Sequence, residues 1–107
     1  MNDQAARIAE LNDAHRRSMS KVTLSSGLAS QPDSTIAALL KRIAEYDAWN
    51  EGDDPYGERD FGVIVHDCER VYWKIDYFDL AMEGLSEDPA DPAVTRRVLT
   101  VCFADEY

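Results

Sequence analysis

The stretch "RDFGVIVHDCERVYWKIDYF", residues 59–78, decides the fold because it reads as a β-hairpin. It predicts a strand over about 59–66, a turn at 67–69 and a second strand over about 70–78. A period of two places alternate residues of the second strand on opposite faces. One face is then mainly apolar and the other mainly polar: Val71, Trp73, Ile75 and Tyr77 against Arg70, Tyr72, Lys74, Asp76 and Phe78. This alternation is typical of a half-buried antiparallel strand.

The residues before the hairpin predict two helices and a short strand. Residues 3–17 have Ile8, Leu11 and His15 at near-helical spacing. The segment 21–26, "KVTLSS", alternates and is rich in β-branched residues, so a strand closed by Gly27 is expected. The strongest helix covers 30–50, with Ser30 and Asp33 in a capping pattern, Pro32 in the first turn and one apolar stripe. That stripe contains Ile36, Leu39, Leu40, Ile43, Tyr46 and Trp49.

After the hairpin, residues 79–91 form an acidic connector, and a final helix is expected to begin at Asp91 with Pro92 in its first position. Its inward residues would be Val94, Val98, Leu99, Cys102 and Phe103. The order is then α-β-α-β-β-α. Residues 1–107 therefore predict a single small α+β domain with helices packed on a short antiparallel sheet.

The net charge of −10 is concentrated in one part of the chain. Residues 1–50 and 92–107 are each neutral, whereas residues 51–91 contain thirteen acidic residues against Arg59, Arg70 and Lys74. Direct binding to nucleic acid or to an anionic membrane is disfavoured, because phosphate contacts need Lys and Arg. A basic protein or nucleoprotein surface is the expected partner.

Patterns that signal metal binding or catalysis are incomplete. A calcium loop starting at Asp53 or Asp54 would need Glu at position twelve, where Ile64 or Val65 stands. The two His and two Cys residues lack zinc-site spacing, and nothing marks Cys68 as an activated nucleophile. We therefore expect no enzyme activity and no cofactor. Two interpretations of the carboxylates in residues 53–60 are left as alternatives. They form an irregular divalent-metal site, or they accept hydrogen bonds from the backbone of their own loop.

The acidic segment supplies the candidate binding residues. Acids two apart on a strand lie roughly 6.6 Å from each other, comparable to neighbouring phosphates on a nucleic-acid strand. Such an array can occupy a Lys/Arg groove that normally holds nucleic acid. The candidate partner-binding residues are Glu51, Asp53, Asp54, Glu58, Asp60, Asp76 and Asp79, together with Tyr72 and Phe78 as aromatic anchors expected to be exposed.

The motifs "DPYGERDFG", "VYWKIDYFD", "DPADPAVTRRVLT" and "ADEY" resemble the signature of a short bacterial family of unknown function, often found on plasmids and prophage-like elements. The resemblance extends from "LNDAHRR" to Tyr107. The resemblance implies that the gene lies on a mobile element. Because the family has no established activity, it implies no catalytic residue in this chain. In that family a small or apolar residue stands where this chain has Cys68, which further argues against a catalytic thiol.

Small acidic proteins from mobile elements include anti-CRISPR inhibitors, some of which bind the DNA-recognition surface of a type I Cascade complex. By analogy in size and charge, we expect a non-catalytic inhibitor of this kind, a nucleic-acid mimic. The alternatives are a housekeeping or regulatory binding module and a weak divalent-metal-dependent enzyme. The N-terminus has no continuous apolar region and no run of about 18 apolar residues occurs, so a cytoplasmic location without a membrane partner is expected.

Overall fold

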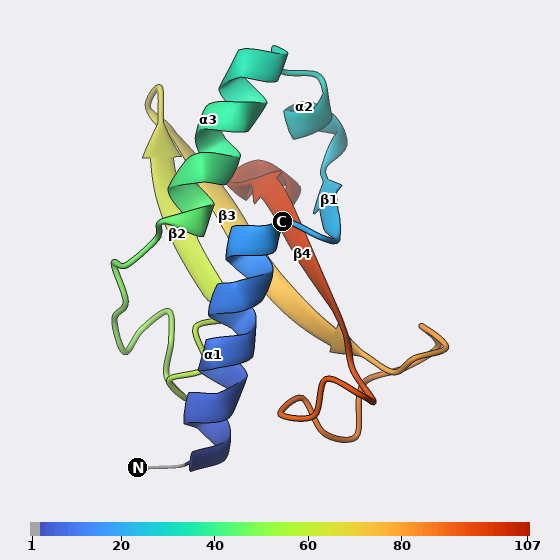
Figure 1. Cartoon of the computed structure of the whole chain (residues 1–107). Coiled ribbons are helices and arrows are strands. Elements are labelled where there is room, and N and C mark those ends of the chain that lie inside the picture. The colour runs from blue at the N-terminus through green and yellow to red at the C-terminus, as the bar shows by residue number, and fades with distance from the viewer. Residues whose placement is uncertain (1–2) are drawn as a thin grey trace.

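Four strands form one mixed sheet in the computed structural model of the chain, which describes residues 3–107 (Figure 1). The elements are α1 (Asp3–Ser18), β1 (Val22–Leu24), α2 (Ser26–Ala29), α3 (Asp33–Ala44), β2 (Phe61–His66), β3 (Glu69–Phe78), β4 (Arg96–Phe103) and the 3₁₀ helix η1 (Ala104–Glu106). The strand order is β1-β4-β3-β2. β1 runs parallel to β4, and the other neighbours are antiparallel. The predicted α+β class is confirmed.

The predicted hairpin is confirmed as β2 and β3, which pair from Phe61 with Lys74 to His66 with Glu69. Asp67 and Cys68 form its turn, with φ values of 51° and 66°. Two-residue hairpin turns favour two left-handed residues because their twist matches that of the strands. The inward face of β3 is also as predicted, and Trp73 on it is fully buried.

The predicted final helix is wrong, since residues 96–103 form β4 between β1 and β3. Leu99 and Val101 face the helices, while Val98 and Cys102 on the opposite face are also buried. A strand buried on both faces shows no alternation, and its apolar residues mimic helical spacing. Asp91 accepts a hydrogen bond from the Ala93 amide at 2.9 Å, so it stabilises a turn and not a helix. The parallel β1–β4 pair makes the sheet mixed and not purely antiparallel.

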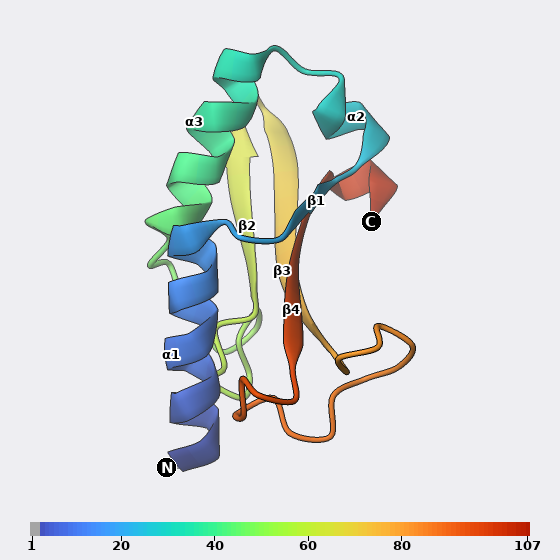
Figure 2. The ribbon, with the colours of Figure 1, turned by 45° about the vertical axis from the view of Figure 1, so that its right-hand side comes forward.

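Helices α1 and α3 cover one face of the sheet, with α3 over the upper half and α1 over the lower half (Figure 2). α3 begins later and ends earlier than predicted, and its N-cap, Pro32, makes no side-chain cap, so the predicted capping by Ser30 and Asp33 is wrong. Tyr46 and Trp49 lie beyond its end. Their ring centres are 5.3 and 5.8 Å from that of Trp73, so they cover the core from an irregular segment.

Gly62 allows this aromatic packing on β2. A Cβ atom at Gly62 would lie 2.5 Å from Nε1 of Trp73 and 2.7 Å from Cζ of Tyr46. Real Cβ atoms do not approach other atoms so closely, so a side chain here would displace the rings. The close approach of Trp73 and Tyr46 to the strand therefore depends on glycine.

The inward face of α1 differs from the predicted one. Ile8 is buried as expected, but Leu11 and His15 are only half-buried. The other buried residues of α1 are Ala9, Asn12, Asp13 and Arg16. The helix therefore places three polar side chains between itself and the rest of the protein. Among residues 3–107, no helix is long and apolar enough to cross a membrane.

Candidate interaction surface at the acidic end of the sheet

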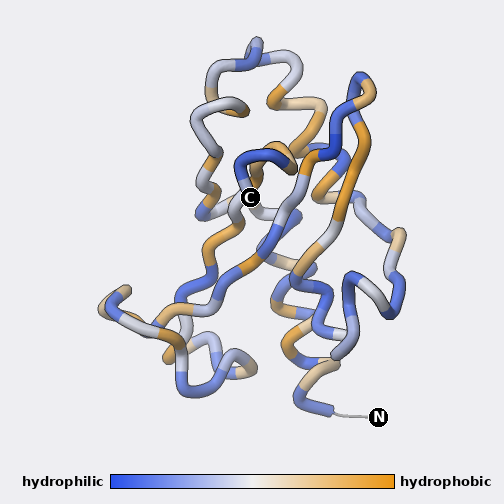
Figure 3. The backbone as a smooth tube through the Cα atoms, turned by 180° about the vertical axis from the view of Figure 1, so that it is seen from behind, coloured by the Kyte–Doolittle hydropathy of each residue, from blue (hydrophilic) through white to orange (hydrophobic). Residues whose placement is uncertain are grey.

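Two loops leave the same end of the sheet and hold most of the net charge. Residues 50–60 precede β2, and residues 79–91 follow β3 (Figures 1 and 2). The sequence assigns net charges of −4 to residues 50–60 and −5 to residues 79–91, so the two segments hold −9 of the total −10. Hydrophilic residues predominate in both, with short hydrophobic segments in the second (Figure 3). We call residues 50–60 and 79–91 the acidic end.

Residues 50–60 are shaped by hydrogen bonds within the loop. The Asp53 amide donates to Oδ1 of Asn50 at 2.9 Å, and Asn50 Nδ2 donates to Asp53 Oδ2 at 3.1 Å. Oδ1 of Asp54 accepts from the Arg59 amide at 2.9 Å. Arg59 has a φ of 58°, which is uncommon for a residue with a side chain. These contacts favour the interpretation that the loop carboxylates bind their own backbone, while Glu51 is exposed.

Asp60 lies where four of the predicted acidic residues come together. Burial, and to a lesser extent the neighbouring charge of Glu58, raise the pKa of its carboxyl to about 6. Asp54 and Asp76 raise the pKa in the same direction. The structure therefore brings Asp76, from β3, to the three loop acids. Their proximity creates a concentrated negative potential.

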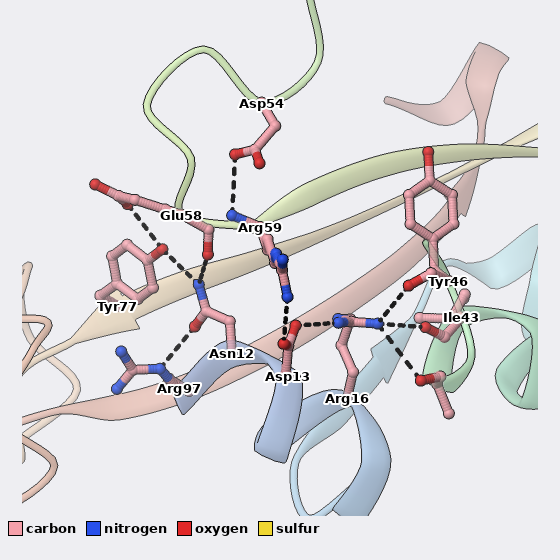
Figure 4. Close-up of polar contacts among 11 residues, drawn as sticks. Asn12, Asp13, Arg16, Ile43, Tyr46, Asp54, Glu58, Arg59, Tyr77 and Arg97 are labelled. Carbon is pink, nitrogen blue, oxygen red and sulfur yellow. Dashed lines mark hydrogen bonds and ion pairs between the residues drawn. The ribbon is translucent and has the colours of Figure 1, made fainter. Parts of the chain in front are cut away.

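A buried asparagine of α1 holds the end of the loop in place (Figure 4). Nδ2 of Asn12 donates to the Glu58 carbonyl and to the Tyr77 hydroxyl, both at 2.9 Å. The Tyr77 hydroxyl donates to Oε1 of Glu58 at 3.0 Å. Nε of Arg97 donates to Oδ1 of Asn12 at 2.7 Å. Burial raises the pKa of Tyr77, so its hydroxyl stays a donor. Both backbone and side chain of Glu58 are thus positioned by α1 and β3.

Asp13, the next residue, pairs with two arginines (Figure 4). One carboxylate oxygen binds Arg16, and the other binds Arg59 at 2.8 Å. Nη1 of Arg16 donates to the Ile43 carbonyl at 2.9 Å, near the end of α3. The Arg16 guanidinium also lies 5.0 Å from the ring centre of Trp49. Burial lowers the pKa of Arg16, while Asp13 raises it. This buried pair joins α1, the end of α3 and loop 50–60.

The remaining predicted site residues separate along β3. Asp76 forms an ion pair with Lys74 at 3.3 Å, and Oδ1 of Asp79 accepts from the Glu83 amide at 3.0 Å. Phe78 lies at the acidic end, but Tyr72 is six residues away, roughly 20 Å along the strand. Both rings are half-buried and not exposed as predicted. Tyr72 packs with Phe61 and Tyr107, which places it outside the acidic end.

Over residues 3–107, no group of three or more His, Cys, Asp or Glu side chains converges in a way that could hold a metal ion. Cys68, which is exposed, and Cys102, which is buried, are both free thiols.

Sequence reasoning missed the residues that position the loop, namely Asn12, Asp13, Arg16 and Arg97. The available signal was the helical spacing of residues 8, 12 and 16, which places Asn12 and Arg16 on the same face as Ile8. Polar residues on the buried face of a helix are uncommon unless they are paired. That spacing pointed to a buried polar network on α1.

Residues 24–106 match the family DUF3768, described as a protein of unknown function. The chain belongs to this family. The DUF3768 region contains both acidic loops and strands β2 to β4, whereas α1 with Asn12, Asp13 and Arg16 precedes it. The expectation of a family of unknown function is confirmed over residues 24–106, whereas the predicted start of the resemblance at residue 11 lies before the matched region. Comparisons with curated proteins and with solved structures found no match.

Proposed function

We propose that this DUF3768 protein is a non-catalytic interaction protein whose acidic end binds a basic, nucleic-acid-binding surface of a partner. The observation that carries the proposal is the gathering of −9 of the net charge in two loops at one end of the sheet. Concentrated charge of one sign raises association rates with an oppositely charged surface and makes binding sensitive to salt. Acids dispersed only for solubility would not need to share one end.

The anchoring of loop 50–60 supports this proposal. Glu58 and Arg59 are tied to Asn12 and Asp13 of α1 by hydrogen bonds of 2.9 and 2.8 Å. A loop held in one shape loses little conformational entropy when it binds, so its charges can act as a preorganised surface. The raised pKa of Asp60, caused by burial and, in smaller part, by the neighbouring carboxylates, is a second support. Carboxylates held this close repel each other, and a cationic partner relieves that repulsion.

The sharpest form of the proposal is an anti-CRISPR-type inhibitor, expected to act in the cytoplasm of a bacterial host. In that form, the acidic end occupies the DNA-recognition surface of a type I Cascade complex. The carboxylates would occupy positions that DNA phosphates otherwise take, so DNA and this protein would compete for the same lysines and arginines.

The test compares two variants of equal charge for binding to purified type I Cascade. The acidic-end variant carries Asp53→Asn, Asp54→Asn and Asp60→Asn in loop 50–60, together with Asp76→Asn in β3 beside that loop. The control carries Asp33→Asn, Asp67→Asn, Glu69→Gln and Asp105→Asn, which lie near the opposite end of the sheet. We expect binding by the wild type to weaken by about tenfold or more between 50 and 200 mM salt, and to be competed by DNA.

The acidic-end variant should bind at least about tenfold more weakly than the control. It lacks four carboxylates at the proposed binding surface, whereas the control keeps those four and lacks four others far from it. Equal affinity of the two variants would contradict the acidic end as the binding surface. Absence of Cascade binding by all three proteins, together with capture of another basic nucleoprotein that DNA displaces, would reject the anti-CRISPR form and keep the general proposal.

A further inference from the structure

A pocket of about 580 Å³ lies between the C-terminal half of α1, the start of β4 and residues 82–92. It forms because β1 pairs with β4 only from Leu99 onward, so the edge of β4 at Arg97 is not covered by a strand (Figure 2). Pockets that hold small molecules commonly have volumes of about 300–1,000 Å³. Its size therefore suits a small ligand.

The charge of this pocket is opposite to that of the protein. Its lining includes Lys21, Arg96, Arg97 and His15, and it includes no carboxylate. In a chain with a net charge of −10, a lining with three permanent cations and no acid is unexpected. Such a site attracts an anion and not the basic partner proposed for the acidic end.

Neutral oxygens hold the two arginines in place. Nε of Arg96 donates to the Leu80 carbonyl at 2.8 Å. Arg97 donates through Nε to Oδ1 of Asn12 at 2.7 Å and through Nη2 to the Pro89 carbonyl. Within residues 3–107, neither arginine forms an ion pair. The guanidinium groups are therefore oriented by their surroundings while their charges lack a direct carboxylate partner.

Lys21 also has no ion pair in the part of the chain that the structure describes. Its carbonyl lies 3.0 Å from Nε2 of His15, which fixes the imidazole beside it.

The rest of the lining is largely apolar, with Leu11, Met82 and Val98 among its residues. A ligand that is only an inorganic ion would leave these side chains without contacts. A ligand with a short apolar body would bury them while its charged group meets the cations.

We propose that this pocket binds a small organic anion, in which one carboxylate or phosphate group is attached to a short apolar body. The anionic group is held by Lys21 and Arg96, and the apolar body lies against Met82 and Val98, because Val98 and Arg96 share one face of β4 whereas Arg97 points to the other face. This binding site is separate from the acidic end and does not depend on the function proposed for it.

The test uses two fluorescent probes with the same apolar body. 8-Anilinonaphthalene-1-sulfonate carries an anionic group, and N-phenyl-1-naphthylamine lacks it. We expect the wild-type protein to bind the sulfonate at least about tenfold more tightly than the neutral amine, since a charged hydrogen bond contributes that much. Equal affinity for the two probes, or no binding of the sulfonate, would overturn the proposal.

Two variants locate the site. The pocket variant carries Lys21→Gln and Arg96→Gln, and its matched control carries Lys41→Gln and Arg17→Gln, which are exposed and do not line this pocket. Sulfonate affinity should fall about tenfold or more in the pocket variant and stay within about twofold in the control. Equal losses in both would show binding outside the pocket. Ala14→Glu, which keeps both cations but adds a carboxylate to the lining, should also abolish binding if the pocket variant does not fold.

Displacement of the bound sulfonate then identifies the anionic group. Octanoate displacing it at lower concentration than phenyl phosphate indicates a carboxylate ligand, and the reverse order indicates a phosphate. Inorganic phosphate should displace it poorly, because it lacks an apolar body. If inorganic phosphate displaces the sulfonate as well as the organic anions do, the proposed apolar half of the site is wrong.

Discussion

Oδ2 of Asp13 in α1 binds Nη1 of Arg59, at the end of loop 50–60, at 2.8 Å. Asp13 lies before the DUF3768 region of residues 24–106, and Arg59 lies inside it. The conformation of an acidic loop therefore depends on a helix that precedes the matched region. α1 and the loop are expected to unfold together as one cooperative unit.

Asp13→Asn should lower the free energy of unfolding by about 3 kcal/mol, because it leaves the buried guanidinium of Arg16 without its counter-charge. Arg16 is only 1% exposed, so water cannot replace the carboxylate. Urea unfolding at pH 7 measures the change. Glu10→Gln is the control, since Glu10 pairs with Arg7 at an exposed site, and it should cost less than about 0.5 kcal/mol. Similar losses in both variants would contradict the role given to Asp13.

Asn12→Ala should cost about 2–3 kcal/mol, because Arg97 and the Glu58 carbonyl each lose a buried hydrogen-bond partner. It should also speed amide hydrogen exchange across residues 50–60, which lose their tie to α1. Asn50→Ala removes only contacts within the loop and is the control for local effects. Unchanged exchange in Asn12→Ala would show that the loop holds its shape without α1.

Gly62→Ala should destabilise the fold by about 1–3 kcal/mol, since the new methyl group overlaps the Trp73 and Tyr46 rings. Tryptophan fluorescence should shift as the rings move, and thermal unfolding gives the loss of stability. Gly84→Ala provides the comparison, because its added Cβ would meet Oδ2 of Asp79 at an ordinary 3.7 Å. A Gly62→Ala protein as stable as Gly84→Ala would contradict the close packing.

Asp60 should make the protein more stable at low pH than at high pH, whereas most carboxylates in folded proteins have the opposite effect. Its pKa rises from 3.8 to about 6 on folding, so the native state holds this proton more tightly than the unfolded chain. The stabilisation from the protonated form is complete below about pH 3.8 and is lost as pH rises through 6. Asp60→Asn should therefore add about 1 kcal/mol at pH 7.5, allowing for solvent screening, and nothing at pH 3.5.

Urea unfolding of wild type and Asp60→Asn at pH 3.5 and pH 7.5 tests this. The same substitution effect at both pH values would indicate a change in packing and not the loss of a carboxylate charge. Asp33→Asn, a charge change far from the cluster in the first turn of α3, controls for the overall reduction in net charge.

The hairpin was predictable because the alternation around Trp73 needs only local information, namely which residues share a strand face. The strand β4 was not predictable in the same way. Val94, Val98 and Cys102 have helical spacing, and Asp91 with Pro92 mimics a helix start. Residues 96–103 form a strand because β3 on one side and β1 on the other supply backbone hydrogen-bond partners, and both are far away in the sequence.

The candidate site, like the fold, was predictable only where its residues are neighbours in the chain. Asp54, Glu58 and Asp60 are close in the chain, so their clustering follows from the sequence. The position of Asp76 beside them, and that of residues 79–91 at the same end, follows from strand register. Tyr72 was grouped with Phe78 because both share one strand face, but their separation along β3 places Tyr72 in a different cluster.

Local patterns were enough to establish the α+β class, the β2–β3 hairpin and the confinement of the excess negative charge to residues 51–91, because each depends on composition or on neighbours in the chain. The tertiary structure alone placed β4 inside the sheet, chose the distant partners of Asn12 and Asp13, and opened a cationic pocket in an acidic protein. These features depend on contacts such as that of Asn12 with Arg97, 85 residues apart, and no short-range pattern specifies which distant partner a side chain meets.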